Sequence, residues 1–275
     1  MSDMVTGDGR THIRSPLMKE SLQDREVQAR AFSEREIEIM PGVTMVSIGG
    51  QSIFDRGAEA ILPLVEELGP LMQEHKLLIG VGGGTRVRHT CSVALDLGLP
   101  TGGVAQLVGA MEECNAVFLN ALLAGHGSIP MQREHFWDLP LYFRSGLTPI
   151  AISVPPYHFW EPPNAEGPMP AHGSDFGLFM HAEVLGMDHI IYVKDEDGLY
   201  DKDPKRHDDA KFIKRTTLAE LQADMPQELI LDRQVFQAWP DARHLERIQI
   251  INGLVPGNLT RALAGEDVGT VITRS

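Results

Sequence analysis

Cysteine is nearly absent from this chain, which has only two, Cys91 and Cys114, among 275 residues. Two cysteines make neither a disulfide framework nor a zinc-binding set. No apolar run approaches the roughly 18 residues that cross a bilayer, and the N-terminus lacks the apolar core of a secretory signal. These absences predict a cytoplasmic protein without a membrane partner.

Basic residues are also scarce, because 24 Lys and Arg stand against 38 Asp and Glu, for a formal net charge of −14. Nucleic-acid-binding proteins usually present a basic face, so this balance argues against a nucleic-acid partner. A small oxyanion responds to a few local groups instead of the net charge. Backbone N–H groups, nearby Arg, Lys or His, or metal ions would therefore have to hold any anionic ligand.

The chain divides by pattern into a polar, aperiodic arm at 1–38 and one domain at 39–275. In the domain, apolar β-branched runs alternate with segments of helical periodicity, which predicts an α/β fold with a mostly parallel sheet covered on both faces. Strands are expected at 43–48, 76–81, 148–154, 189–193, 247–252 and 269–273. Helices are expected from 58, from 84 to Gly98, around 114–122, at 174–186 with Ser174 or Asp175 as the cap, at 232–245 and after Pro256.

Two glycine loops follow the first two of these strands. Gly49 and Gly50 form the first, and 82–84 form the second, with Arg86 and Arg88 just behind it. Backbone N–H groups at a helix start, together with guanidinium groups, suit a phosphate or another tetrahedral oxyanion. Strand-to-helix turns also need glycines for backbone reasons alone. The spacing fits neither the dinucleotide fingerprint nor a Walker A loop.

The stretch "KDEDGLYDKDP" at 194–204 crowds aspartates and lysines into one turn. It is not a calcium loop, since Leu199 stands where an oxygen ligand is needed and no Glu stands at the twelfth position. Two interpretations stay open. One is a solvated Asp-Gly turn, and the other is the rim of a nucleotide site, with lysines on phosphates and Tyr200 beside a base.

His158 lies in "PPYHFWEPP", a proline-stiffened loop rich in aromatic residues. A lone loop histidine is usually a surface residue, and aromatic loops are often buried at subunit contacts. The alternative is a metal-ligating role, because imidazole is a common metal ligand.

Taken together, these stretches resemble the amino acid kinase superfamily, whose uridylate and acetylglutamate kinases transfer the γ-phosphate of ATP. The likeness rests on "VSIGGQS", "GVGGGTRVR", "GSDFGLFMHAEVLGMDHIIYVKDEDGLYDKDPK" and "VPGNLTRALAGEDVGTVIT", in that order and spacing. Within the superfamily, "DRGAEAILPLVEEL", "RHTCSVALDLGLP" and "PPYHFW" resemble the molybdenum-storing members. The resemblance covers about residues 41–275.

The resemblance implies a three-layer αβα sandwich around a twisted, mainly parallel sheet. Storage members form hexameric cages that bind ATP with a divalent cation, here Mg²⁺, and pack molybdate or tungstate as polynuclear oxide clusters. By position, Ser47 and Asp175 would form the transfer site, and His158 matches a cluster-ligating histidine. The nucleotide and its phosphates would meet Gly49, Gly50, Gly83, Gly84, Arg86, Lys194, Asp197, Tyr200, Lys202 and Pro204.

Two departures from the family pattern bear on function. The family lysine that meets the transferred phosphate is Ser47 here, and a single histidine, His158, stands where one subunit type has three. Three hypotheses follow: a storage subunit in a homo- or hetero-oligomer with a related subunit, most simply a hexamer; a uridylate-kinase-like phosphotransferase; or a regulatory nucleotide-binding subunit. Loss of the lysine predicts at most weak ATP hydrolysis or phosphotransfer.

Overall fold

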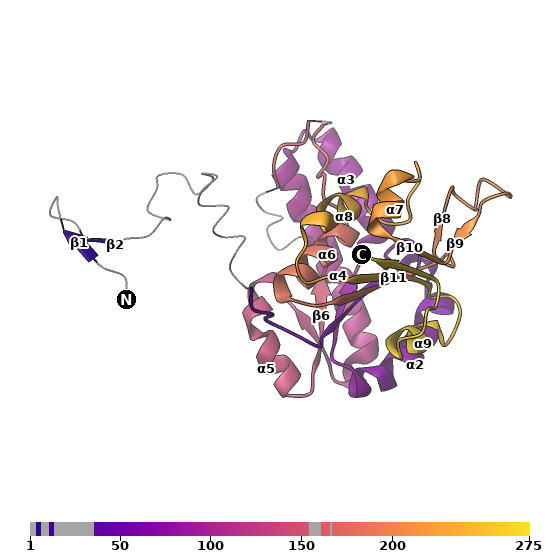
Figure 1. Cartoon of the computed structure of the whole chain (residues 1–275), viewed down its shortest axis with the longest axis horizontal. Helices are drawn as coiled ribbons and strands as arrows, with labels where there is room; N and C mark the ends of the chain where they lie inside the picture. The colour runs from indigo at the N-terminus through magenta and orange to yellow at the C-terminus, as the bar shows by residue number, and fades with distance from the viewer. Residues whose placement is uncertain (1–3, 7–10, 14–35, 154–160, 166) are drawn as a thin grey trace. The chain divides into compact units, whose positions relative to one another are not determined.

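The computed structural model describes residues 4–6, 11–13, 36–153, 161–165 and 167–275 (Figure 1). The chain separates into two compact units, Met1–Ile37 and Glu38–Ser275. In the first, β1 (Met4–Thr6) and β2 (Thr11–Ile13) pair antiparallel. The second contains the folded domain and both glycine loops.

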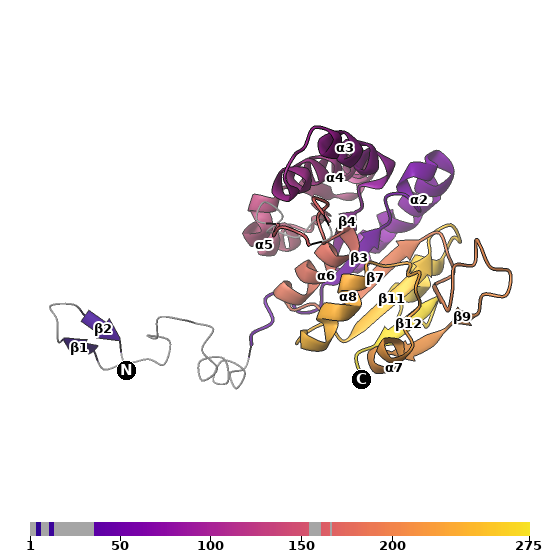
Figure 2. The same cartoon turned by 90° about the horizontal axis from the view of Figure 1, so that it is seen from above.

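One mixed sheet forms the middle layer of the second unit (Figure 2). Its strands are β3 (Thr44–Ile48), β4 (Leu77–Val81), β5 (Ser128–Met131), β6 (Thr148–Ile152), β7 (His189–Lys194), β10 (Arg215–Thr217), β11 (Arg247–Asn252) and β12 (Thr270–Thr273). They lie in the order β10-β12-β11-β7-β3-β4-β6-β5. Neighbouring strands are parallel from β5 to β11, and β12 is antiparallel to β11.

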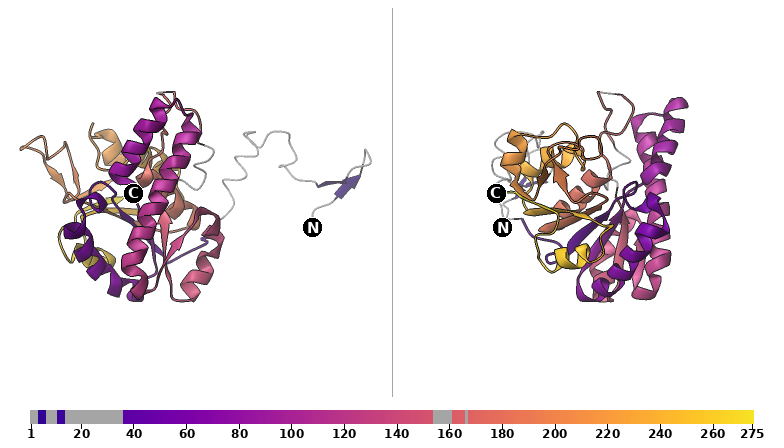
Figure 3. Two further views of the ribbon diagram at one scale, coloured as in Figure 1. Left: turned by 180° about the vertical axis from the view of Figure 1, so that it is seen from behind. Right: turned by 90° about the vertical axis from the view of Figure 1, so that its right-hand side faces the viewer.

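Helices cover both faces of the sheet (Figure 3). On one face lie α2 (Ala58–Glu74), α4 (Thr101–Leu123) and α9 (Asn258–Leu263), and α3 (Gly84–Asp96) packs on α4. On the other lie α5 (Leu139–Arg144), α6 (Ser174–Leu185), α7 (Leu218–Ala223) and α8 (Arg233–Ala238). The predicted three-layer α/β fold is confirmed.

Successive side chains of β3 point alternately into the two helical layers. Val46 and Ile48 pack with α2 and α4, whereas Met45 packs on the α6 side. Because successive side chains point to opposite faces, Ser47 belongs to the α6 side as well. This places position 47 beneath the start of α6.

Two predicted helix features were wrong. The helix expected at 232–245 ends much earlier, since α8 stops at Ala238 and a 3-10 turn, Trp239–Asp241, follows it. Pro240 has no N–H to continue an α-helix. At the start of α6, neither Ser174 nor Asp175 is the cap, because the N-cap position is Gly173 and makes no side-chain hydrogen bond.

Helix α4 has an apolar outer face. With the turn after it, Thr101–His126 is long and apolar enough to cross a membrane by length and composition, contrary to the expectation that no apolar run approaches that length, and 33% of its most apolar 18-residue segment is buried. It also packs on β4, β5 and β6 as part of a layer. Its exposed large side chains are Val117, Phe118 and Leu122, so this face remains available for a further apolar contact.

Candidate functional site

A cleft of about 860 Å³ opens where β3, β4 and β7 end. Sheets of this kind bind ligands at the carboxyl ends of their strands, at the point where the strand order reverses, and β3 occupies that point between β4 and β7. Both glycine loops line the cleft, as do the first turn of α6 and the end of β7. The predicted residues gathered there are Gly49, Gly50, Gly83, Gly84, Asp175 and Lys194.

The two glycine loops touch each other. A Cβ atom on Gly50 would lie 2.3 Å from the Gly84 nitrogen and 2.6 Å from the Gly82 carbonyl oxygen, so only glycine fits. From beneath, the buried side chain of Asn115 donates from Nδ2 to the carbonyls of Gly82 and Gly83, at 2.8 and 3.1 Å. The backbone of the cleft floor is therefore held closely in place by α4.

Asp175 and Lys194 form a nearly buried ion pair at the centre of the cleft. Lys194 Nζ donates to both carboxylate oxygens, at 2.7 and 2.9 Å, and each side chain is 11% exposed. The Tyr192 hydroxyl donates to the Asp175 carbonyl at 2.8 Å, which fixes the start of α6 to β7. A cation thus stands beside the glycine loops, where a phosphate would need one.

Asp232 supplies the cap that α6 lacks locally. Its Oδ2 accepts from the backbone N–H of Phe176 at 3.1 Å. Burial raises the pKa of Asp232 to about 6, with the neighbouring Asp175 carboxylate adding to the rise. A Cβ atom on Gly173 would lie 2.4 Å from this Asp232 oxygen, so the glycine permits the close approach.

A second cavity, of about 210 Å³, adjoins the cleft and is lined by Tyr200, Lys202 and Pro204. The Tyr200 ring packs on Phe212 with centroids 5.5 Å apart. Lys202 Nζ lies 2.5 Å from the Asp209 carboxylate. The structure thus brings together, around a small hollow, Tyr200, predicted to lie beside the base, and Lys202, predicted to meet the phosphates.

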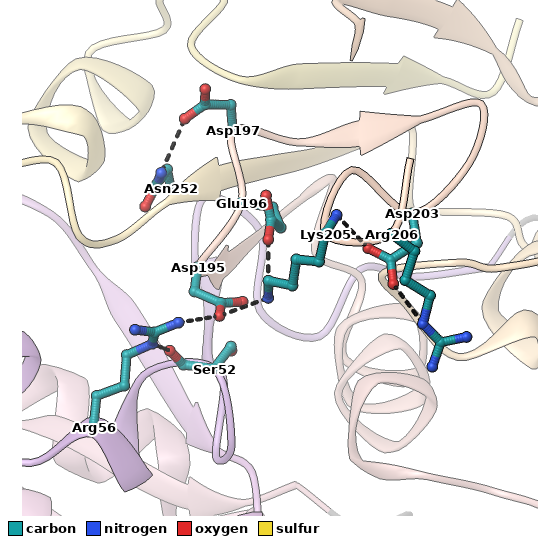
Figure 4. A network of polar contacts seen from close by, with 9 residues as sticks. All are labelled: Ser52, Arg56, Asp195, Glu196, Asp197, Asp203, Lys205, Arg206 and Asn252. Carbon is teal, nitrogen blue, oxygen red and sulfur yellow. Dashed lines mark hydrogen bonds and ion pairs between the residues drawn. The ribbon is translucent and has the colours of Figure 1, made fainter. Parts of the chain in front are cut away.

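An ion network lies where the two cavities meet (Figure 4). Asp195 accepts from Arg56 Nη2 at 2.6 Å and from Lys205 Nζ at 3.0 Å. Lys205 also pairs with Glu196 at 2.9 Å. Arg56 is further anchored through Nε to the Ser52 carbonyl at 2.8 Å. The loops after β3 and β7 are tied together by these charges.

Three predicted residues stand apart from both cavities in the described part of the chain. Ser47 is buried in β3, with 2% exposure. The Arg86 guanidinium packs over the neighbouring rings of Phe54 and Phe118, 5.6 and 5.2 Å from their centroids, whereas Arg88 lines the cleft. Asp197 accepts from Asn252 at 2.9 Å. His158 lies outside the described residues.

Arg56 and Asp232 are two of the cleft residues for which the sequence predicted no role. Arg56 ends a 3-10 turn, Phe54–Arg56, that follows the first glycine loop. The stretch "DRGAEAILPLVEEL" contributed to the family resemblance, but no site role was predicted for Arg56. Asp232 precedes α8 and was included in the helix expected at 232–245. An Asp immediately before a helical pattern is a cap signal, although here the side chain reaches α6 instead of α8.

Comparison with known proteins agrees with this architecture. A model of the amino acid kinase family matches residues 159–234. The crystal structure of a uridylate kinase from Archaeoglobus fulgidus superimposes with a TM-score of 0.65 at 21% identity, covering 84% of this chain and 99% of that one. The αβα layers around the mostly parallel sheet are therefore those of the amino acid kinase fold.

Sequence relatives show which group within the amino acid kinase family the chain resembles. The chain is 45% identical over 259 residues to the molybdenum storage protein subunit beta of Azotobacter vinelandii, covering 94% of this chain and 96% of the relative. It is 27% identical over 241 residues to a uridylate kinase of Methanobrevibacter smithii, covering 83% and 97%. The chain belongs to the amino acid kinase family and, within it, to the molybdenum storage protein subunits.

Proposed function

We propose that this chain is a subunit of a cytoplasmic storage oligomer that binds ATP with Mg²⁺ and holds molybdate or tungstate as polynuclear oxide clusters. The observation that carries the proposal is the 45% identity, over nearly the whole chain, to a molybdenum storage protein subunit. Likeness of that extent includes the loops as well as the core.

The cleft supports the nucleotide part of the proposal. Its glycine loops offer backbone N–H groups, and Arg56, Arg88, Lys194 and Lys205 contribute positive charge to its lining. The adjoining cavity at Tyr200 offers an aromatic surface for a base. Phosphates would lie along the glycine loops, with the base beyond the Asp195 network.

The carboxylates of the cleft fit a magnesium ion carried by the nucleotide. No group of three or more His, Cys, Asp or Glu converges as a metal site among the described residues. Mg²⁺ at phosphates needs only one or two carboxylates, because phosphate oxygens and water supply the other ligands. Asp55, Asp175 and Asp232 all line the cleft. Mg²⁺ there would neutralise charge on the phosphates.

A uridylate-kinase-like phosphotransferase is the second candidate, and the uridylate kinase relatives favour it. Ser47 counts against it. A buried hydroxyl donates one hydrogen bond but cannot neutralise developing charge, and one such electrostatic contact is typically worth ~10²–10³ in rate. A regulatory nucleotide-binding subunit without cargo is the third candidate. The absence of a lysine at position 47 favours it, because such a subunit needs no turnover.

Assembly into an oligomer, most simply a hexamer, completes the proposal. Val117, Phe118 and Leu122 expose an apolar strip on α4 that suits burial against another subunit. The relative is a subunit beta, which supports assembly with another subunit, with a homo-oligomer as the alternative. The proposal includes neither nucleic acid nor membrane, in line with the net charge of −14.

Three measurements on one preparation test the proposal. The protein is loaded with molybdate or tungstate and ATP-Mg, and bound metal is counted by mass spectrometry beside an ATPase assay and light scattering. A storage subunit retains many metal atoms per chain in a particle near 180 kDa, six times the 30.3 kDa chain mass. Rapid phosphotransfer to a small acceptor without retained metal would establish the kinase. A monomer near 30 kDa would exclude the cage.

A further inference from the structure

Arg56 and Lys205 converge on the same carboxylate oxygen. Asp195 Oδ2 lies 2.6 Å from Arg56 Nη2 and 3.0 Å from Lys205 Nζ (Figure 4). The Asp195 side chain is only 11% exposed, whereas those of Arg56 and Lys205 are 46% and 57% exposed. The anion is thus held in place, and both cations retain room to turn toward another partner.

This oxygen stands at the junction of the two cavities. Asp195 and Lys205 line both hollows, and Arg56 lines the larger one. Any anionic ligand that extends from the glycine loops toward Tyr200 passes beside it. Such a ligand meets two cations that the protein has already paired with carboxylates of its own, Asp195 with both of them and Glu196 with Lys205.

The Asp195 carboxylate is a strong competitor for those cations. Burial raises the pKa of Asp195, but hydrogen bonds from Arg56 and Lys205 outweigh burial, and the pKa lies below its ordinary value. The group is therefore ionised at neutral pH. Because it is part of the chain, its effective concentration at the two cations far exceeds that of a free ion in solution.

We propose that Asp195 is a built-in counter-ion that makes this cleft selective for polyphosphates over single tetrahedral oxyanions. A lone phosphate or molybdate has to displace Asp195 to reach Arg56 and Lys205, and it engages only one set of groups at a time. A chain of phosphates also engages the glycine loops and Lys194, so it can displace the carboxylate and still bind. The inference rests on the proposed nucleotide site, and it explains how cargo oxyanion and nucleotide are kept apart.

The decisive variant is Asp195→Asn, which keeps the size of the side chain and removes its charge. Calorimetry at pH 7.5 measures binding of orthophosphate, orthomolybdate and tripolyphosphate without added metal. We expect orthophosphate and molybdate to bind about tenfold tighter to the variant, as a lost charge repulsion of about 1.4 kcal/mol implies. The affinity for tripolyphosphate should rise less. The ratio of tripolyphosphate affinity to orthophosphate affinity should therefore be lower in Asp195→Asn than in the wild type.

Asp267→Asn is the matched control, since Asp267 also lies between two arginines, Arg215 and Arg247, and lines neither cavity. It should leave all three affinities unchanged. Adding Arg56→Met to Asp195→Asn should abolish the gain for orthophosphate, because one of the released cations is then missing. Circular dichroism confirms that each variant is folded.

Two results would overturn the inference. One is an unchanged affinity ratio in Asp195→Asn. The other is a parallel weakening of all three ligands, which would mean that Asp195 only positions its cations. A wild-type protein that binds neither tripolyphosphate nor ATP would contradict the proposed nucleotide site and, with it, the selectivity for polyphosphates. If the wild type binds both ligands, the two results above contradict the inference alone.

Discussion

The Lys194 ammonium lies 5.9 Å from the centroid of the Tyr192 ring, and Tyr192 is the residue that pairs with Ser47 across β3 and β7. Strand β7 therefore places the Lys194 ammonium near the ring of Tyr192, the residue beside Ser47 in the sheet. Lys194 cannot fully replace a lysine at 47, because Asp175 engages it with both oxygens.

Ser47→Lys should raise ATP hydrolysis, by up to ~10²–10³ if charge at the transferred phosphate is what the wild type lacks. Ser47→Met is the control, because it has a similar chain length and no charge. Steady-state phosphate release measures both variants. Equal rates in wild type and Ser47→Lys would show that position 47 does not limit turnover.

Lys194→Met should destabilise the domain by about 3 kcal/mol, because it leaves the nearly buried Asp175 carboxylate without its cation. Adding Asp175→Asn removes that charge, so the double variant should recover most of the loss. Urea unfolding at pH 7.5 measures the free energies. If the double variant is no more stable than Lys194→Met, the pair makes no coupled contribution.

Gly50→Ala should destabilise the domain by more than about 1 kcal/mol and weaken nucleotide binding, because the added methyl group meets the backbone of Gly82 and Gly84 at 2.3–2.6 Å. Gly103→Ala in α4 is the control, since its nearest neighbour would be 3.6 Å away, and it should be neutral or stabilising. Thermal melts and calorimetry measure both effects. Equal behaviour of the two variants would contradict the tight loop contact.

Stability should depend on pH through Asp232. Its folded pKa of about 6 exceeds the ordinary value of 3.8, so between these values the folded state binds a proton that the unfolded state has released. The stability that Asp232 contributes is therefore lost as pH rises from about 4 to about 6. Relative to Asp232→Asn, the free energy of unfolding of the wild type should fall by roughly 2–3 kcal/mol over that pH range. Urea unfolding from pH 4 to 7 measures it, and a constant difference would refute the raised pKa.

His158→Ala should keep the oligomer intact and lower the molybdenum or tungsten retained after loading with oxyanion and ATP. A neutral imidazole can ligate an oxo-metal centre, and a protonated one can donate to an oxide cluster. Metal analysis beside light scattering measures both properties, with His207→Ala as a control in an exposed turn. Unchanged metal content would place the cargo elsewhere.

The sequence predicted the layers better than the contacts within the cleft. Apolar β-branched runs such as "TMVSI" and "HIIYV" became central strands because burial on both faces demands that composition. The glycine loops follow those strands, as predicted, and they line the cleft where the strands end. Short edge pieces such as β5, with the sequence "SIPM", have no periodicity and were missed.

Pairings between distant parts of the chain were the part that sequence reasoning could not reach. Arg86 looked like a phosphate ligand beside its loop, yet Phe54 and Phe118 take its guanidinium. Asp232 caps a helix that begins 58 residues earlier, at Ser174. Such contacts depend on tertiary packing, and local propensity says nothing about them.

The central position of β3 has a consequence for synthesis of the chain on the ribosome. Its partner β4 follows after 28 residues, but its other partner, β7, starts at residue 189. Until then one edge of a strongly apolar strand has no hydrogen-bonding neighbour, and such edges template aggregation. A nascent chain arrested before His189 should therefore depend on a chaperone that shields strand edges.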